Sequence, residues 1–263
     1  IIDAKPIEED LRFSPKYFSK PVDTEFNWRK EGSLNEALEL CNGAGVCRKL
    51  SESGGTMCPS YMATNDEKDS TRGRANVFRQ VFEGDDPEQY KSEELKEALS
   101  LCLSCKACKS ECPANVDMAK MKSEFMNGWH KTQKRNFSDW FFVNSSKLYG
   151  LASLFPSLAN QFSNLDLSKK MLENIAGISR NRTLPKFAKQ TFKSWWKSYE
   201  CKESQDVVVL HVDIFTNYHE PEIAISAVKV LEKMGFQVLV TFVDTLGRPH
   251  LSKGFLREAK EIA

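Results

Sequence analysis

The chain has 263 residues, with 37 Lys and Arg against 36 Asp and Glu. This length allows one large domain or two modest ones, and the balanced charge gives no indication of a nucleic-acid partner. No apolar run approaches the roughly 18 residues that a membrane span needs, so we expect a protein that is not transmembrane. No signal peptide is visible. Because the chain starts without Met and stops inside a predicted helix, we interpret it as a fragment of a longer protein.

The first half of the chain predicts a helical domain. Residues 1–32 are charged and lack a clear period, and we interpret them as a linker or arm. Ser33 and Glu36 form a capping-box pattern ahead of a helix that delivers Cys41. Residues 48–55 read as a loop. Three further helices are predicted. The first covers 71–82, the second begins at Ser92 and carries Cys102 on its buried apolar face, and the third follows an N-cap at Asp117.

The second half changes character twice. Residues 131–204 are predicted to be a helical connecting region that is basic and aromatic. We interpret the aromatic stretch 137–162 as core packing, with a membrane-surface, quinone or partner face as the alternative. Residues 205–263 read as strand 206–213, helix 221–235, strand 236–243 and a helix from Ser252. That order predicts a truncated parallel α/β domain.

Seven of the eight cysteines fall into two clusters that indicate iron–sulfur chemistry. Cys102, Cys105, Cys108 and Cys112 follow the bacterial ferredoxin spacing, with Pro113 directly after. In this spacing three thiolates hold one cluster and the fourth ligates the other. We therefore expect Cys102, Cys105 and Cys108 to hold cluster II, a [4Fe–4S] cluster, with Cys58 as the fourth ligand.

The first cysteine group is one ligand short. Cys41 and Cys47 have the spacing of a first and third ligand, and Ala44 occupies the middle position. Cluster I would then be held by Cys41, Cys47 and Cys112. Three outcomes remain open: a [3Fe–4S] cluster, a [4Fe–4S] cluster whose fourth iron takes another ligand, or no cluster. We favour a bound cluster, because three cysteines at the right spacing would otherwise be coincidence.

Zinc is the alternative metal, since it also takes thiolates. A zinc site needs only four ligands, commonly as two separated pairs, whereas here seven cysteines form two runs that each close in Cys-Pro. Disulfides are disfavoured by the three-residue spacing, which makes a reducing cytoplasm the expected compartment. Cys201 stands alone and reads as a spectator, and none of the four histidines is assigned as a base.

Arg72 and Arg74 begin the helix between the two motifs. A helix N-terminus and two guanidinium groups would stabilise an anionic cluster and raise its potential, so we expect both arginines beside the clusters. Ordinary capping with surface arginines is the competing interpretation.

The motifs and their surroundings resemble a known family. The residues that carry the resemblance are CNGAGVCRK from Cys41, GGTMCPSYMAT around Cys58, STRGRANVF from Ser70 and LCLSCKACKSECPANVDMAKMKSEF from Leu101. They are similar to the iron–sulfur part of large FAD-linked oxidoreductases of the D-2-hydroxyglutarate and D-lactate dehydrogenase type. The glycolate oxidase iron–sulfur subunit is a more distant relative.

The resemblance implies a redox role and several partners. An FAD-binding domain would precede this region in the same polypeptide, and a cysteine-rich "CCG" domain would follow it, opening at 213–221. Electrons would pass from a D-2-hydroxy acid through FAD and the clusters to a quinone or an electron-transfer flavoprotein. The family's CCGRP segment is DTLGRP at 244–249 here, so both cysteines are replaced and thiol chemistry at that position is doubtful.

The sequence thus predicts a mainly α protein, with an α-helical ferredoxin-type domain at 33–130 followed by the truncated α/β domain. We expect the iron–sulfur electron-transfer module of a flavin-dependent 2-hydroxy-acid dehydrogenase that carries no substrate site itself. An iron–sulfur subunit of a heterodisulfide-reductase-like or glycolate-oxidase-like enzyme is the alternative, and a non-catalytic zinc-binding interaction module is the alternative from another class. Peripheral attachment at the inner membrane face and a homo-oligomer stay open.

Overall fold

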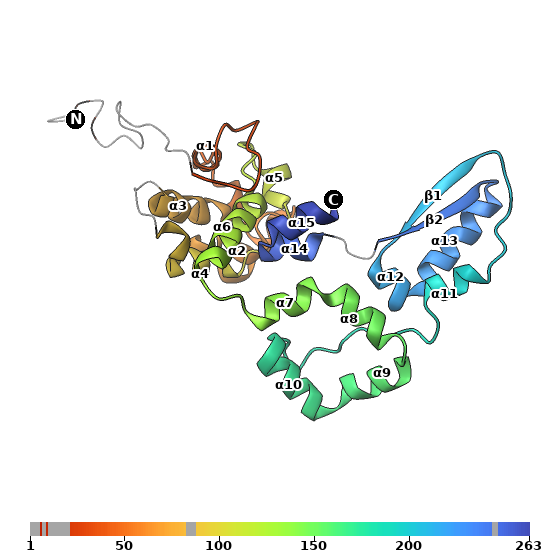
Figure 1. Ribbon diagram of the computed structural model, residues 1–263. Coiled ribbons are helices and arrows are strands. Elements are labelled where there is room, and N and C mark those ends of the chain that lie inside the picture. The colour runs from red at the N-terminus through yellow and green to blue at the C-terminus, as the bar shows by residue number, and fades with distance from the viewer. Residues whose placement is uncertain (1–5, 7–8, 10–21, 83–87, 244–246) are drawn as a thin grey trace. The chain divides into compact units, whose positions relative to one another are not determined.

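The structure is a computed structural model that describes residues 6, 9, 22–82, 88–243 and 247–263. It is mainly helical and divides into two compact units, residues 1–133 with 254–256 and residues 134–253 with 257–263 (Figure 1). Among the described residues, no helix has the length and apolar character needed to cross a bilayer. The predicted mainly helical fold with a parallel sheet is confirmed.

The first unit is built from short helices and 3-10 turns. Its elements are α1 (Leu34–Glu39), η1 (Val46–Arg48), η2 (Ser51–Ser53), α2 (Pro59–Thr64), η3 (Glu67–Asp69), α3 (Thr71–Phe82), η4 (Gln89–Lys91), α4 (Glu93–Ser100), α5 (Ala107–Glu111) and α6 (Met118–Thr132). Helix α3 packs against α1, α4 and α6 (Figure 1). Phe78 of α3 and Phe125 of α6 are fully buried in the core between them, with ring centroids 5.9 Å apart.

Side-chain caps fix where these helices begin, as the sequence predicts. The Ser33 hydroxyl accepts a hydrogen bond from the backbone N–H of Glu36, and the Asp117 carboxylate accepts one from Lys120. Such caps satisfy N–H groups that a helix leaves unpaired. One boundary differs from the prediction, because α4 ends at Ser100 and leaves Cys102 in the following loop. Cys102 is half-buried there.

The second unit contains the sheet and the aromatic helices. Its elements are α7 (Phe137–Val143), α8 (Ser145–Ala152), α9 (Pro156–Asn164), α10 (Asp166–Ala176), α11 (Phe192–Lys197), β1 (Val207–Val212), α12 (Ile214–Tyr218), α13 (Pro221–Lys233), β2 (Gln237–Phe242), α14 (Arg248–Lys253) and most of α15 (Leu256–Ile262). Strands β1 and β2 pair in parallel from Val207 opposite Gln237 to Val212 opposite Phe242. Helix α13 connects the two strands, as the β-α-β pattern predicts.

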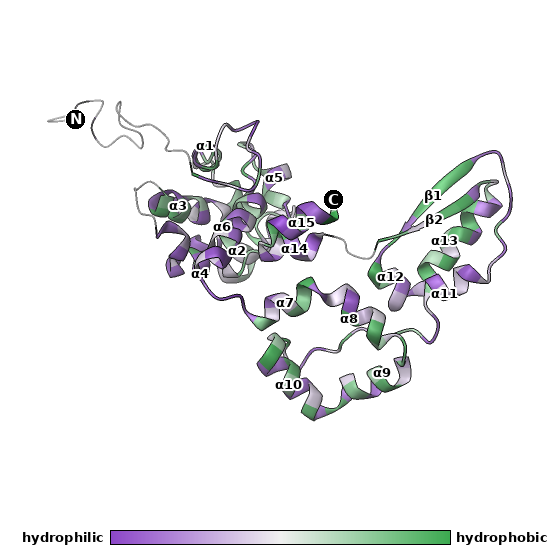
Figure 2. Cartoon of the chain, in the orientation of Figure 1, coloured by the Kyte–Doolittle hydropathy of each residue, from purple (hydrophilic) through white to green (hydrophobic). Residues whose placement is uncertain are grey.

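Burial in the sheet alternates along β1. Val212 is buried with Val238 of β2 and Val228 of α13, whereas Val207 and Val209 are 53% and 58% exposed. Figure 2 shows both strands as strongly hydrophobic. A parallel sheet usually carries helices on both faces, and the described residues cover only one face here.

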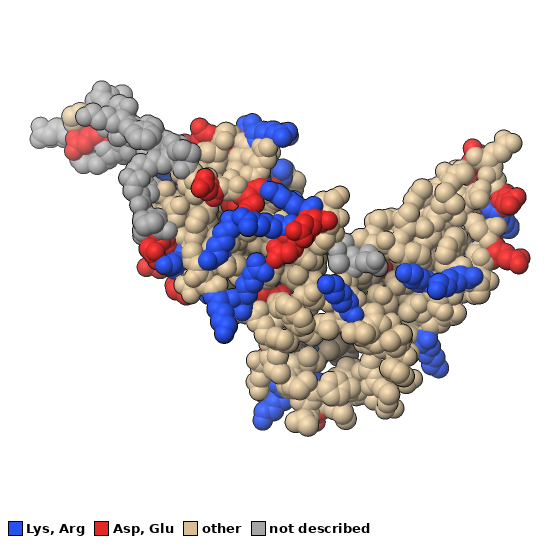
Figure 3. All heavy atoms as spheres, in the orientation of Figure 1, with Lys and Arg blue, Asp and Glu red and all other residues tan. Residues whose placement is uncertain are grey.

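Two predictions for the second unit need correction. The aromatic stretch 137–162 was expected to be core, but Phe137, Trp140, Phe155 and Phe162 are 47–66% exposed. Figure 3 shows few charged atoms on the visible face of α7–α10. The helix predicted from Ser252 is two helices, because Gly254 adopts a φ of 76° between α14 and α15. Asp244, Thr245 and Leu246 of the DTLGRP segment lie outside the described residues, as does most of the predicted arm at 1–32.

Candidate metal centre

The structure arranges the seven cysteines around two separate cavities in the first unit. One cavity, with about 330 Å³ of space free of protein atoms and partly open to solvent, is lined by Cys58, Cys102, Cys105 and Cys108. The other, with about 290 Å³, is lined by Cys41, Cys47 and Cys112. We call these site II and site I. This is the same division that the ferredoxin spacing predicts, with Cys58 and Cys112 each crossing to the other motif's site.

The two sites are direct neighbours. Met57 and Thr71 line both cavities and therefore form part of the wall between them. Met57 is 1% exposed and Thr71 is 2% exposed, so water is excluded from this wall. The two sets of thiols therefore line adjacent cavities that share one wall within the first unit.

Left-handed backbone positions let the ligand loops curl around the cavities. In the first loop, Gly43 and Gly45 have φ values of 79° and 76°, and they flank Ala44. In the second loop, Ser104 and Lys106 have φ values of 52° and 64°, which non-glycine residues adopt at a cost. Lys122 of α6 holds this second loop by donating a hydrogen bond to the carbonyl oxygen of Cys102 at 2.6 Å.

Glu111 ties the two motifs together. Its carboxylate accepts hydrogen bonds from the backbone N–H and hydroxyl of Thr56 at 2.7 and 2.6 Å, and it pairs with Lys49 at 2.7 Å. These interactions hold the pKa of Glu111 well below its usual value, at about 2, with the Lys49 bond as the largest cause. Because Glu111 precedes Cys112 and Thr56 lies two residues before Cys58, this clasp fixes both crossing cysteines. No pattern in the sequence singles out Glu111.

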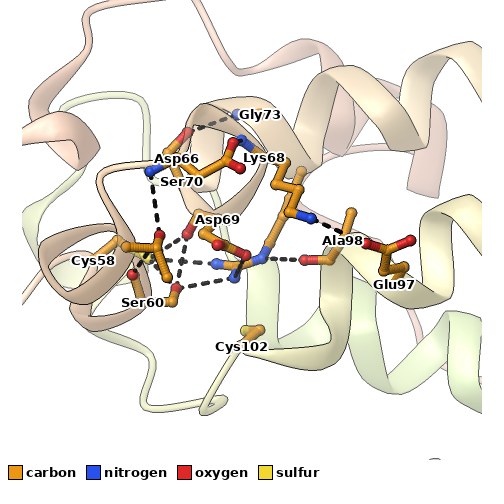
Figure 4. Close-up of polar contacts among 12 residues, drawn as sticks. Cys58, Ser60, Asp66, Lys68, Asp69, Ser70, Gly73, Glu97, Ala98 and Cys102 are labelled. Atoms are coloured by element: carbon orange, nitrogen blue, oxygen red, sulfur yellow. Dashed lines mark hydrogen bonds and ion pairs between the residues drawn. The ribbon is translucent and has the colours of Figure 1, made fainter.

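Arg74 lies next to site II, as the sequence predicts. It is fully buried, and its guanidinium donates hydrogen bonds to Cys58 Sγ at 3.4 Å, Ser60 Oγ at 2.9 Å and the carbonyl oxygen of Ala98 at 2.7 Å. Figure 4 shows these contacts around Cys58 and Ser60, with Cys102 nearby. Asp69 is the countercharge, with its Oδ1 at 3.6 Å from Arg74 Nη2.

Arg72 reaches site I in a different way. Its backbone N–H donates to Cys47 Sγ at 3.3 Å, whereas its guanidinium pairs with Glu67 at 2.7 Å. The N-terminal turn of α3 therefore points toward Cys47, and the positive end of a helix favours a thiolate there. Arg72 also lines the site I cavity, and its positive charge interacts electrostatically with Cys47 and Cys41. Both predicted arginines therefore lie beside a cysteine site, and of the two only Arg74 donates a side-chain hydrogen bond to a cysteine.

The start of α6 serves site II in the same manner. The backbone N–H groups of Met118 and Ala119 hydrogen-bond to Cys108 and favour its thiolate, although burial has the larger effect and raises the pKa of this thiol to about 11. Burial is also the main cause of the raised pKa of Cys47. Residue spacing alone could not reveal these amide donors, but the Asp117 cap marks where the α6 amides begin.

Among the described residues, no group of three or more His, Cys, Asp or Glu side chains is placed to hold a single metal ion. The thiols instead surround space at two points, and thiolates are the ligands that iron–sulfur clusters use. The residues present therefore fit such clusters in donor chemistry and in the cavities they enclose. Cys201 lies apart in the second unit, half-buried, with its thiol directed to the carbonyl oxygen of Val238 at 3.3 Å.

Residues 33–117 match the family model of the 4Fe-4S dicluster domain. This dicluster segment contains all seven cysteines of the two sites. No solved structure was found to match the chain.

Curated relatives extend the similarity beyond the dicluster segment. D-2-hydroxyglutarate dehydrogenase of Escherichia coli K12 is 25% identical over 92% of this chain, which corresponds to 28% of that protein. One component of the anaerobic glycerol-3-phosphate dehydrogenase of the same strain is 30% identical over 47% of the chain, and 32% of that protein is covered. The glycolate oxidase iron-sulfur subunit of this strain is 33% identical over 30% of the chain, which corresponds to 17% of that protein. The chain is thus homologous to iron–sulfur and dehydrogenase proteins, and it spans 28–30% of the length of the first two D-2-hydroxyglutarate dehydrogenases compared.

Proposed function

We propose that the chain is the iron–sulfur electron-transfer module of an FAD-linked dehydrogenase that oxidises a D-2-hydroxy acid, with D-2-hydroxyglutarate preferred over D-lactate. The observation that carries the proposal is the sorting of seven cysteines around two adjacent cavities. Iron–sulfur clusters, when bound, take up and release single electrons. Two such sites separated by one layer of residues suit the relay of electrons between a flavin and an acceptor.

In this proposal Cys58, Cys102, Cys105 and Cys108 hold a [4Fe–4S] cluster at site II. Cys41, Cys47 and Cys112 hold a [3Fe–4S] or an incompletely ligated [4Fe–4S] cluster at site I. Ala44 lines the site I cavity and is exposed. This part of the cavity wall therefore provides no sulfur ligand and is open to water.

The protein's own groups set the electrostatics of each site. At site II the permanent charge of Arg74 lies against Cys58, and at site I the α3 amide of Arg72 lies against Cys47. Both stabilise added negative charge, and the Arg72 guanidinium, which lines site I and interacts electrostatically with Cys47 and Cys41, adds a positive charge there as well. We therefore propose that both reduction potentials are raised, and that electrons leave the module through site II, whose ligand Cys105 is exposed.

The reach of the similarity favours a hydroxy-acid dehydrogenase over a separate iron–sulfur subunit. The D-2-hydroxyglutarate dehydrogenase match spans both units, whereas the glycerol-3-phosphate dehydrogenase and glycolate oxidase matches cover less than half of the chain. FAD and the hydroxy-acid site belong, in this proposal, to the remainder of the polypeptide. A quinone or an electron-transfer flavoprotein is the proposed acceptor, and the reducing cytoplasm the proposed compartment.

Metal analysis of the anaerobically purified full-length protein tests the iron–sulfur assignment. We expect iron and acid-labile sulfide in near-equal amounts and a broad absorption at the blue end of the visible spectrum. One zinc per chain in a colourless preparation would instead support the zinc-binding interaction module.

The substrate assignment needs a separate measurement. D-2-hydroxyglutarate added anaerobically should bleach the flavin and then produce the EPR signal of reduced clusters, while the L enantiomer should do neither. Faster cluster reduction by D-lactate than by D-2-hydroxyglutarate would mean that D-lactate is the preferred substrate. Reduction by neither acid would contradict the proposal that the enzyme oxidises a hydroxy acid.

A further inference from the structure

One of the seven cysteines differs from the rest in its exposure. Cys105 is exposed, Cys102 and Cys112 are half-buried, and the other four are buried. Electron tunnelling weakens steeply with distance, so a partner protein exchanges electrons fastest where a cluster ligand reaches the surface. Within the dicluster segment, we expect electron exchange with a partner protein to be fastest at the surface around Cys105.

A surface depression lies beside Cys105. It holds about 1080 Å³ of space, open solvent included, and shares Pro59, Cys105, Lys106 and Ala107 with the wall of site II. Small-molecule sites enclose most of their ligand, whereas this depression is broad and open. Its form therefore suits the convex surface of a protein. It is lined by Thr56, Pro59, Cys105, Lys106, Lys109 and Ser110.

The rim of the depression is positively charged. Lys106 and Lys109 are both exposed, and Lys106 has no ion-pair partner among the described residues. Lys109 lies 3.1 Å from Asp117, yet its side chain stays 57% exposed. The nearby carboxylate of Glu111 is already bound by Lys49 and Thr56. Lys106 and the exposed part of Lys109 thus place positive charge beside the exposed ligand, which complements a partner that presents carboxylates.

We propose that this depression is the docking surface for an electron-accepting protein with an acidic face, which takes electrons from site II through Cys105. The inference rests on the proposed electron-transfer function and adds to it the place of electron exit and the charge of the partner. Electrostatic steering would make the association fast and sensitive to salt.

Charge reversal tests the proposal in the full-length protein. Clusters reduced under anaerobic conditions are mixed in a stopped-flow instrument with cytochrome b5, an acidic haem protein, or with cytochrome c, a basic one. Lys106→Glu/Lys109→Glu should slow cytochrome b5 reduction about tenfold at low salt and accelerate cytochrome c reduction. A damaged cluster would slow both reactions, so opposite signs identify docking. Lys30→Glu, which changes an exposed lysine outside the depression, should alter neither rate.

Zero-length carbodiimide cross-linking gives a readout independent of turnover. Peptide mass spectrometry should find cytochrome b5 carboxylates joined to Lys106 and Lys109, and not to Lys30. Unchanged rates in the double variant, or cross-links that avoid both lysines, would overturn the docking surface. EPR of the reduced wild-type protein distinguishes failure of the electron-transfer function from failure of the docking surface. Absence of a cluster signal would refute the electron-transfer function. A normal cluster signal, with cytochrome reduction rates that the double variant leaves unchanged, would refute only the docking surface.

Discussion

Arg74 donates a hydrogen bond from Nη1 to Cys58 Sγ at 3.4 Å, and its side chain is fully buried. A permanent cation held against one ligand of site II stabilises the reduced, more negative state of a cluster bound there. The contact links a residue of α3 to the cysteine that crosses from the first motif into the second site.

Replacing Arg74 should therefore lower the reduction potential of site II. Hydrogen bonds to charged groups contribute about 1.5–3 kcal/mol, and about 1.4 kcal/mol corresponds to ~59 mV for one electron. Because only the part that differs between the oxidised and reduced states counts, a fall of up to roughly 120 mV is expected. EPR-monitored redox titration of Arg74→Met/Asp69→Asn measures it. The paired change is used because Asp69 alone would remain as an unpaired buried charge. It removes one positive and one negative charge, so the fall in potential reports the lost hydrogen bond to Cys58 and not a change in net charge.

The matched control for Arg74 is Arg72→Gln. The Arg72 guanidinium pairs with Glu67, and only the backbone N–H of Arg72 contacts Cys47. This variant should leave the potential of site II within about 20 mV of the wild type and lower the potential of site I, because the Arg72 charge acts on Cys47 and Cys41 and, among the described residues, makes no contact with a site II cysteine. Equal shifts of the site II potential in the Arg74 and Arg72 variants would show that the overall positive charge near the sites, and not the contact with Cys58, sets that potential.

Ala44 offers a direct test of site I. It lines the same cavity as Cys41, Cys47 and Cys112, at the middle position of the ferredoxin spacing. Ala44→Cys should supply a fourth thiolate and convert a [3Fe–4S] cluster to a [4Fe–4S] cluster. The EPR signal of the oxidised protein should then disappear, with a gain of one iron per chain. Ala44→Ser is the size-matched control, and an Ala44→Cys protein with unchanged iron and EPR would argue against a [3Fe–4S] cluster at site I.

Cysteine reactivity in the iron-free protein should follow burial. The thiolate is the reactive form, so exposure and pKa together set the rate of alkylation. Cys105 is exposed, whereas burial raises the pKa of Cys108 to about 11. Iodoacetamide at pH 8 should therefore label Cys105 first and Cys108 last among the site II cysteines, as followed by peptide mass spectrometry. Equal labelling rates would mean that site II is not preformed without iron.

The lowered pKa of Glu111 leads us to expect that the stability of the fold falls at acid pH. Its pKa is about 2 in the folded protein and near 4.5 when unfolded, so its contribution is complete above pH 4.5 and is lost as the pH falls toward 2. Thermal denaturation of Glu111→Gln should show a lower Tm than wild type at pH 7 and a shrinking difference below pH 4.5. Glu97→Gln, at an exposed ion pair with Lys68, is the control and should change Tm little. If the Tm difference between Glu111→Gln and wild type instead grew as the pH falls, the stabilising interactions of ionised Glu111 with Thr56 and Lys49 would be refuted.

Much of the first unit could be predicted because local signals and tertiary structure agree. The caps at Ser33 and Asp117 begin α1 and α6, and the span of α3 is the predicted 71–82. The ferredoxin spacing also anticipated which cysteines share a cavity, since short spacers force neighbouring thiols around one point.

Other features depend on contacts that no local pattern encodes. The role of Glu111 joins residues 55 positions apart, and the burial of Arg74 depends on Asp69, Ser60 and Ala98 closing around it. The aromatic residues of 137–162 have the spacing of a core, yet Phe155 is 66% exposed, because periodicity identifies an apolar face without saying what covers it.

The crossing of Cys58 and Cys112 is the central claim, and paired alanine variants test it most directly. EPR spectra of anaerobic full-length protein are recorded as isolated and after reduction. Cys58→Ala should abolish the reduced signal of site II and keep the signal of site I, whereas Cys112→Ala should do the reverse. Loss of site I in Cys58→Ala with retention of site II, or two variants that each keep both signals, would contradict the account.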